Sequence, residues 1–221
     1  RDPDMATAAD TLARSRGITR DMQDAWAIHS HKKACAAHPH TGEITPIAGQ
    51  LRDPFARHLT PALAARAKSL TGSITAANMA VAADGAAFCV VVSEQMRRQL
   101  GRDGISILGG ATKGHTPSMP ALAPLAAIEA AFRQTRISVN SITCAEIMEA
   151  FAVQAIACVQ GANLDPEHVN VGGGALARGH PIGASGTVNA VRLYHTLQQR
   201  GGTGLAAIAA AGGIARACPA R

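Results

Sequence analysis

A glycine-rich run around one histidine is the stretch of this sequence whose residue types could do chemistry. Residues 170–186 read NVGGGALARGHPIGASG, and the histidine is His180. Glycine lets a loop backbone approach a ligand closely, and the apolar spacing that follows predicts a helix beginning at or just after Pro181. A histidine at such a helix start could donate to an oxyanion or act as a base. A tight turn in which His180 only caps the helix is the other interpretation of the same residues.

The composition indicates a globular protein with a real core. The chain has 221 residues, of which 47% are hydrophobic and 16% charged. That balance is ordinary for a folded domain. The formal charge is +6, but lysine and arginine are scattered and no basic run is interleaved with aromatics, so we expect no nucleic-acid partner. A basic surface would suit an anionic ligand, and a solvated surface without a partner fits equally well.

Cysteine and histidine spacing predicts neither a disulfide framework nor a metal site. The cysteines are odd in number and irregularly spaced, without a CxxC pair: Cys35, Cys89, Cys144, Cys158 and Cys218. Four histidines lie close in sequence, namely His29, His31, His38 and His40. On a helix, positions i and i+2 face different sides, so we expect no metal. Reduced thiols, together with the lack of a signal peptide or an apolar span, predict a cytoplasmic protein without a membrane segment.

The positions before residue 102 predict helices, loops and one strand. Residues 5–17 give a helix that ends at Gly17, and a longer helix follows with Thr19 as its cap. The apolar run AAFCVVVS at 86–93 predicts a buried strand with Cys89 in the core, and residues 93–101 predict a helix capped by Ser93.

Strand and helix patterns alternate in the rest of the chain. A strand is predicted at 105–114, a helix at 124–138, a strand running into a helix at 142–159, and two strands around Gly212 and Gly213. Counted from residue 86, the order is βαβαβαββ. It predicts an α/β fold, in which a mixed sheet carries helices on its faces.

Three stretches resemble the thiolases, the acyl-CoA C-acyltransferases that make or cleave 3-ketoacyl-CoA. GHPIGASG is similar to their C-terminal histidine motif, residues 7–37 resemble their loop domain, and residues 70–101 resemble the segment that follows it. The resemblance implies the C-terminal half of the thiolase fold, preceded by a mainly helical loop sub-domain that binds CoA. It therefore places a sub-domain at residues 1–70 and the C-terminal-half domain at 71–221.

The resemblance also implies roles for single residues. His180 corresponds to the oxyanion-hole histidine, Met148 stands in place of the motif asparagine, and Ala209 stands in place of the catalytic cysteine. Met148 cannot donate a hydrogen bond and Ala209 carries no titratable proton, so the acid/base site is degenerate, and Cys218 is not expected to replace the lost thiol. Positions implied to bind substrate or CoA are Asn78, Ala80, Phe151 and Gly183. The implied substrate is a coenzyme A thioester, without a further cofactor.

The resulting expectation is a thiolase-type acyltransferase polypeptide seen as a C-terminal portion. It would lack the half that carries the nucleophile, so this chain alone is expected to be inactive. The alternative is a non-catalytic acyl-CoA-binding or scaffold subunit of an active partner enzyme, or a chain that folds without a present role. Half of the fold would leave apolar helix faces uncovered, which predicts a homo-oligomer or a heteromer with an N-terminal thiolase half.

Overall fold

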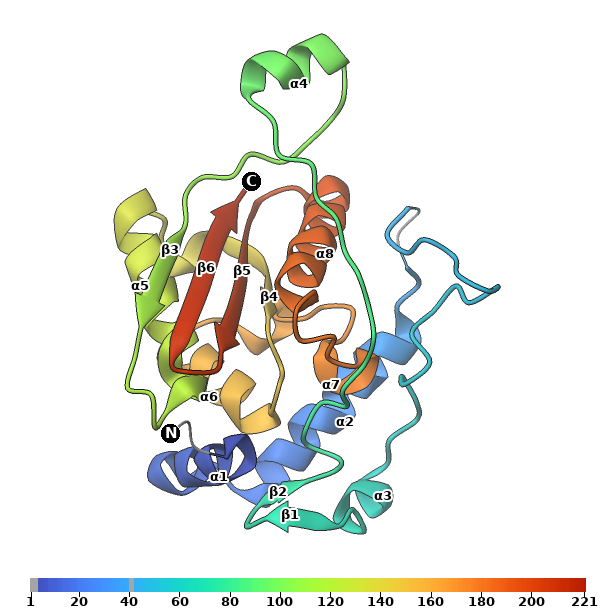
Figure 1. Ribbon diagram of the computed structural model, residues 1–221, viewed down its shortest axis with the longest axis vertical. Coiled ribbons are helices and arrows are strands. Elements are labelled where there is room, and N and C mark those ends of the chain that lie inside the picture. The colour runs from blue at the N-terminus through green and yellow to red at the C-terminus, as the bar shows by residue number, and fades with distance from the viewer. Residues whose placement is uncertain (1–3, 40–41) are drawn as a thin grey trace.

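The computed structural model describes residues 4–39 and 42–221, which form a mixed sheet with helices on both faces and a smaller helical part at one end (Figure 1). The helices are α1 (Met5–Arg16), α2 (Arg20–Ala36), α3 (Pro61–Ala65), α4 (Glu94–Leu100), α5 (Ala123–Thr135), α6 (Ala152–Gly161), α7 (Ala175–Arg178) and α8 (Ser185–Arg200). Short 3-10 turns are η1 (Pro120–Leu122), η2 (Val139–Ser141) and η3 (Pro166–His168). The strands are β1 (Ser69–Thr71), β2 (Ile74–Thr75), β3 (Ala111–Gly114), β4 (Ile142–Ile147), β5 (Thr203–Ala210) and β6 (Ile214–Ala220).

The main sheet has the strand order β3-β6-β5-β4 within the described residues. Strands β4 and β5 are parallel, whereas β6 is antiparallel to both of its neighbours. A tight turn joins β5 to β6 at Gly212 and Gly213, whose φ angles of 80° and 76° favour glycine. Because β4 and β5 run the same way, their carboxyl ends lie at one edge of the sheet. This mixed α/β architecture confirms the fold class predicted from the sequence.

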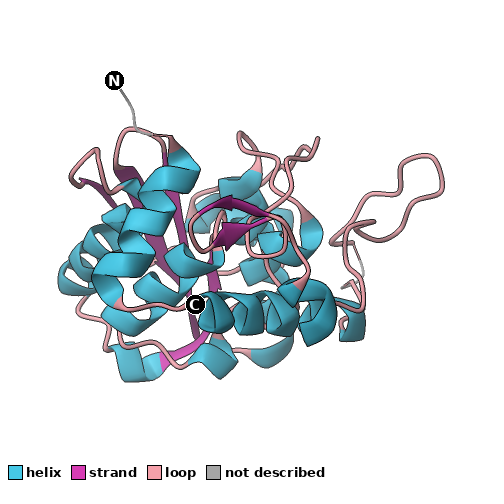
Figure 2. Cartoon of the chain, turned by 90° about the horizontal axis from the view of Figure 1, so that it is seen from below, coloured by secondary structure: helices cyan, strands magenta, loops and turns pink. Residues whose placement is uncertain are grey.

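Alanine-rich helices pack closely on the two faces of this sheet. On one face, α5 and α6 bury Ile128 and Val159 against Leu205 of β5. On the other face, Leu193 and Leu197 of α8 pack with Cys144 of β4. Seen from below, helices surround the strands on both sides (Figure 2).

The helices before residue 70 follow the local signals of the sequence. Gly17 ends α1 with a left-handed φ of 64°, and the Thr19 side chain accepts a hydrogen bond from Met22 N at the start of α2. Leu12 of α1 is buried with Ile156 of α6. The helical part thus shares a core with the end of the sheet where β4 finishes (Figure 1).

The prediction of a buried strand at residues 86–93 is wrong. Residues 84–93, called the strap below, run as an extended green trace past α8 to α4, which stands clear of the sheet (Figure 1). Phe88 and Val90 are each 88% exposed, and Cys89 is exposed rather than part of a core. A strand needs a neighbour to satisfy its backbone groups, and none of the described strands pairs with the strap.

Two further boundaries differ from the sequence prediction. The helix expected at or just after Pro181 begins only at Ser185, because residues 181–184 form a turn closed by Ala184 N and Pro181 O at 2.8 Å. The strand expected at 105–114 is regular only in β3, with an isolated pairing of Ile107 to Ala220 before it.

Candidate functional site

The carboxyl edge shared by β4 and β5 gathers the predicted active-site positions. Met148 follows β4 directly, is buried, and donates its N–H to Ala207 O at 3.0 Å. Ala209 lies two residues further along β5, opposite Ala215 of β6. The ends of two parallel strands therefore bring Met148 and Ala209 close together although they are 61 positions apart in the numbering.

Residues 78–83, called the linking segment below, connect this edge to the His180 loop. Ala80 N donates to Ala150 O at 3.0 Å and Ala152 N donates to Asn78 O at 2.9 Å, so the segment runs alongside Phe151. At the residue after Ala80, Val81 O accepts from His180 N at 2.8 Å. The linking segment thus joins Asn78, Ala80 and Phe151 to His180, four of the positions predicted from the sequence.

His180 is half-buried and held by a serine that the sequence analysis missed. Its Nδ1 lies 2.7 Å from Oγ of Ser185, and that hydroxyl donates to Pro181 O at 2.9 Å. A hydroxyl has one hydrogen, so with that hydrogen on Pro181 the ring must donate from Nδ1, leaving Nε2 as an acceptor. Burial lowers the pKa of His180, so the ring is neutral near neutral pH. Ser185 is the serine of GHPIGASG, placed one turn after Pro181 on α8.

The predicted CoA-binding positions differ in exposure. Asn78 is fully buried: its Nδ2 donates to Asp24 Oδ1 at 2.9 Å and to Ser73 O at 3.1 Å, and its Oδ1 accepts from Thr75 N at 2.8 Å. These bonds fix the turn that starts the linking segment, which is a positioning role. Ligand contact by any of the four residues stays a prediction; Ala80 and Phe151 are buried and Gly183 is exposed.

Cysteine cannot supply an activated thiolate from the interior of this chain. Burial raises the pKa of Cys144 to about 11 and that of Cys158 to about 12, and it also raises the pKa of Cys89 and of Cys218. The thiolate is the nucleophilic form. Cys218 pairs with Ala206, three positions along the ladder from Ala209, a spacing of roughly 10 Å.

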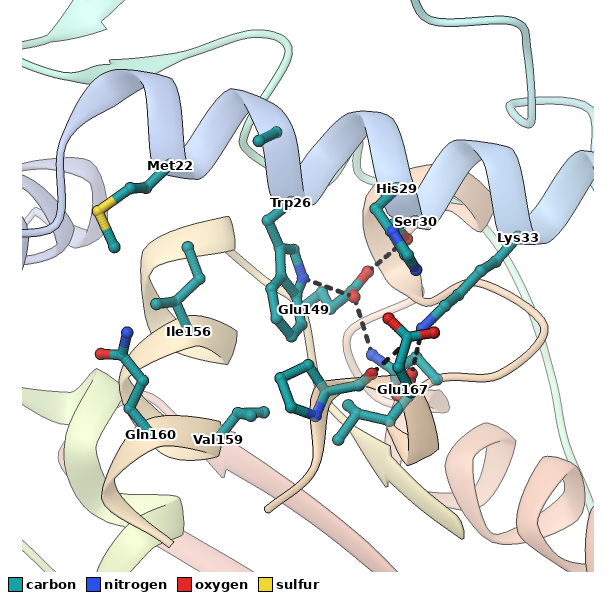
Figure 3. Close-up of a pocket in the computed structure, with 14 residues that line it drawn as sticks. Met22, Trp26, His29, Ser30, Lys33, Glu149, Ile156, Val159, Gln160 and Glu167 are labelled. Carbon is teal, nitrogen blue, oxygen red and sulfur yellow. Dashed lines mark hydrogen bonds between the residues drawn. The ribbon is translucent and has the colours of Figure 1, made fainter. Parts of the chain in front are cut away.

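A buried glutamate organises the loop that leads to His180. Glu149, 1% exposed, accepts from Trp26 Nε1 at 2.9 Å and Ser30 Oγ at 2.8 Å (Figure 3). It also accepts from Asn170 Nδ2 at 2.8 Å and from Leu176 N at 3.3 Å. The only sign in the sequence that Glu149 belongs to the site is its place directly after Met148, and the sequence gives no indication of its hydrogen-bond partners.

Glycine is required where this glutamate meets the loop. A Cβ at Gly174 would lie 2.3 Å from Glu149 Oε2, too close for any larger residue without movement. The backbone N of Gly174 donates to Ser30 Oγ at 3.0 Å. Gly174 therefore serves close packing against the carboxylate.

A second set of buried charges attaches residues 43–53 to α7 and α8. Arg192 forms ion pairs of 3.0 Å with both Glu146 and Glu43, and Arg178 pairs with Asp53 at 2.5 Å. Burial raises the pKa of Glu146, against the lowering effect of Arg192. This charge cluster holds the N-terminal half of the chain onto the helix that follows His180.

The described residues, 4–39 and 42–221, contain no group of three or more metal-ligating side chains. His31 is buried and its Nδ1 accepts from Arg57 N at 3.3 Å, whereas His29 is exposed. His40 lies outside the described residues. No helix in this part of the chain is long and apolar enough to cross a membrane.

Two family models match this chain, one before residue 96 and one after residue 101. The family model described as "Thiolase, C-terminal domain" matches residues 102–220, and "Thiolase, N-terminal domain" matches residues 1–95. A probable acetyl-CoA acyltransferase of Staphylococcus aureus (strain bovine RF122 / ET3-1) is 35% identical over 96% of this chain and 58% of its own length. The putative acetyl-CoA C-acetyltransferase YhfS of Bacillus subtilis (strain 168) is 36% identical over 96% of this chain and 62% of its own length.

Solved structures agree with these relatives. The crystal structure of the Bacillus anthracis acetyl-CoA acetyltransferase superposes with a TM-score of 0.91 at 31% identity, covering 100% of this chain and 61% of that one. Human mitochondrial 3-ketoacyl-CoA thiolase superposes with a TM-score of 0.89 at 28% identity, covering 98% of this chain and 59% of that one. The chain therefore spans about 60% of the length of these proteins.

The family models also explain the strap. The N-terminal model ends at residue 95, directly after the strap, and the C-terminal model begins at residue 102, before β3. The strap thus belongs with the N-terminal domain and not with the sheet of β3 to β6. The prediction that the chain holds only a C-terminal portion is not supported, since residues 1–95 match the N-terminal model. The division at residue 70 stays a prediction.

Proposed function

We propose, on the premise that this chain belongs to the thiolase family, that it is part of an acyl-CoA C-acyltransferase acting by Claisen condensation or thiolysis of 3-ketoacyl-CoA. Within that enzyme, it would supply the His180 loop and part of the surface that holds the CoA thioester. The arrangement of His180, Ser185 and Pro181 is the observation that carries the proposal. It fixes a neutral imidazole beside the carboxyl edge of β4 and β5.

The hydroxyl of Ser185 would let His180 serve in two ways. With the hydroxyl hydrogen on Pro181 O, Nε2 of His180 is an acceptor and can take a proton. If the hydroxyl turns its hydrogen to Nδ1, the ring proton belongs on Nε2, which can then donate to the oxyanion of a thioester carbonyl. The two roles thus differ by a turn of the Ser185 hydroxyl together with a change of tautomer, in which Nδ1 gives up its proton to solvent and Nε2 takes one from solvent.

The chain does not itself provide the other groups that the chemistry needs. Position 148 carries a buried thioether and position 209 a methyl group, and the interior thiols have raised pKa values. The second candidate function, a non-catalytic acyl-CoA-binding or scaffold subunit, is favoured by Met148 and Ala209. Both candidates require that the thioester bind at His180.

Calorimetric titration with acetyl-CoA and with CoA tests the shared requirement. His180→Ala should weaken acetyl-CoA binding more than CoA binding, because only the thioester offers a carbonyl oxygen to the ring. Equal losses for both ligands would contradict a role at the thioester. His168, an exposed histidine of η3 to which no role at the site is assigned, provides the matched control: His168→Ala should leave the ratio of the two affinities unchanged.

A thiolysis assay separates the two candidates. The acyltransferase proposal expects turnover of acetoacetyl-CoA by the chain together with a polypeptide that carries the rest of an N-terminal thiolase domain. The subunit proposal expects binding of acetyl-CoA without turnover in the same mixture. Restoring Met148→Asn and Ala209→Cys should not give turnover in the chain alone, and turnover there would mean that a nucleophile has been misplaced.

Association with a further copy or with an N-terminal thiolase half is part of the proposal. The strap exposes an extended apolar edge, and exposed apolar patches of this kind mark contact surfaces. A monodisperse monomer at micromolar concentration, measured by light scattering after sizing, would contradict it. A cytoplasmic location is also proposed, since the cysteines are free and a reducing compartment keeps them so.

A further inference from the structure

A pocket of about 370 Å³ opens between α2 and α6 (Figure 3); it reaches Asn170 at the start of the glycine-rich run, but His180 does not line it. None of the four single positions at which the resemblance implies substrate or CoA binding lines it, although α2 belongs to the sub-domain that the resemblance implies to bind CoA. Its wall is formed by α2 on one side, α6 on the other, and η3 with the residues that follow at one end. The acyl-transfer chemistry discussed above makes no use of this space.

One end of the pocket is apolar and has a fixed aromatic floor. Met22 and Trp26 come from α2, and Ile156 and Val159 face them from α6. The indole N–H of Trp26 donates to Glu149 Oε1 at 2.9 Å, which fixes the ring plane. A hydrocarbon body lying on this floor would remove apolar surface from water at both helices.

The other end of the pocket carries Lys33, which forms no ion pair within residues 4–39 and 42–221. Lys33 Nζ donates to Val169 O at 3.0 Å and to Pro166 O at 3.3 Å, and an ammonium has three hydrogens to donate. Burial lowers the pKa of Lys33, against the raising effect of Glu167.

The carboxylates near Lys33 do not neutralise it. Glu149 already receives hydrogen bonds at both oxygens, from Trp26, Ser30 and Asn170. Glu167 is exposed at the mouth of the pocket, where water screens its charge. A partly buried cation is therefore left beside a pocket whose other end is apolar, with one hydrogen for which no acceptor is found among the described residues, and such a cation is stabilised by an anionic partner.

We propose that this pocket binds a small monocarboxylate with an apolar body. The carboxylate would accept from Lys33, and the hydrocarbon would lie on Trp26 between Met22 and Ile156. A neutral molecule of the same shape would gain the apolar contacts only, so charge at one end is the feature by which the pocket selects its ligand.

The single tryptophan of the chain gives a direct test. Trp26 is the only tryptophan and lies in the pocket, so its fluorescence reports occupancy without a label. Titration with octanoate should give a saturable change, and 1-octanol should bind about tenfold more weakly because it lacks the charge-assisted hydrogen bond. No saturable change with octanoate at millimolar concentration, or equal binding of the two compounds, would overturn the proposal.

Substitutions at Lys33 and its neighbours sharpen the test. Lys33→Met should reduce octanoate affinity about tenfold and leave octanol unaffected, whereas Lys32→Met is the matched control because Lys32 is exposed and does not line the pocket. His29→Glu places a carboxylate four residues before Lys33, a pairing that supports the helix and competes with the ligand. That variant should fold at least as well and lose octanoate binding.

The remaining outcomes also decide the question. Octanoate binding that survives Lys33→Met and His29→Glu unchanged would show that the carboxylate does not meet Lys33. Loss of octanoate binding in His180→Ala, or displacement of octanoate by CoA, would place the compound at the thioester site instead. Unchanged octanoate affinity in His180→Ala supports a separate pocket, and so the result is independent of the acyl-transfer function.

Discussion

Replacing Arg192 by methionine removes a cation that forms ion pairs with two buried carboxylates. The guanidinium lies 3.0 Å from Glu146 and 3.0 Å from Glu43, and the three side chains are 9%, 3% and 8% exposed. Methionine keeps most of the aliphatic volume, so the change removes charge and hydrogen bonds and little packing. Glu146 of β4 is then left buried without its partner.

The expected loss is large for a single residue. Breaking a buried ion pair on one side costs about 3–5 kcal/mol, and for a domain of this size about 1 kcal/mol lowers the melting temperature by roughly 2–4 °C. A fall of about 10 °C is therefore expected for Arg192→Met at neutral pH. The value lies far outside the small effect of an ordinary surface substitution.

The loss should also depend on pH, with a defined sign. Burial raises the pKa of Glu146 in the folded chain, and Arg192 opposes that rise. Without the arginine the folded-state pKa rises further above the unfolded value, so the folded variant binds the proton first as pH falls. The difference in unfolding free energy between wild type and variant should therefore shrink from about pH 7.5 towards pH 5.

Urea unfolding followed by circular dichroism at both pH values measures this difference. Arg200→Met on the same helix is the matched control, because Arg200 is exposed, and its effect should stay below about 1 kcal/mol. A loss for Arg192→Met below about 1 kcal/mol would refute the reasoning. A loss of unfolding free energy that stays constant or grows as the pH falls would also refute it, since the unpaired carboxylate of Glu146 would then not be the cause of the loss.

Three further measurements address other parts of the chain. The pKa of His31 is lowered by burial to about 4, so unfolding free energy should fall as pH drops from about 6.5 towards 4; His31→Gln should flatten that slope, and an unchanged slope would exclude this histidine. Ser185→Ala should shift the tautomer of His180 away from Nδ1–H, read by nitrogen NMR of the ring, and an unaltered spectrum would contradict the hydrogen bond. Phe88→Ser with Val90→Ser should reduce self-association in sedimentation velocity while changing unfolding free energy by less than about 0.5 kcal/mol. Association that persists in this double variant would show that the strap is not the surface of self-association.

Helix starts and helix ends were predicted correctly where residues nearby in the sequence determine them. Gly17 ends α1 and Gly101 ends α4, each in a left-handed conformation. Thr19 and Ser93 cap the helices that follow them. These are interactions between residues a few positions apart, so composition and order suffice to find them.

The strap and the Glu149 contacts could not be predicted in the same way. An apolar run such as that of residues 86–93 forms a strand only beside a neighbour, and none of the described strands pairs with it. Glu149 takes its hydrogen bonds from side chains as far away in sequence as Trp26. Such partners become visible only when tertiary packing has brought α2 beside the end of β4.

The linking segment sets a limit on how this chain can vary in length. It pairs at Met79 with Phe151 and at Ala82 with His180, so two distant parts of the chain are spaced by three residues of extended backbone. Inserting or deleting one residue between these pairings would displace one of them by about 3.3 Å. Gains and losses of residues during evolution should therefore fall outside this segment, for instance in residues 45–52, which are exposed and largely irregular.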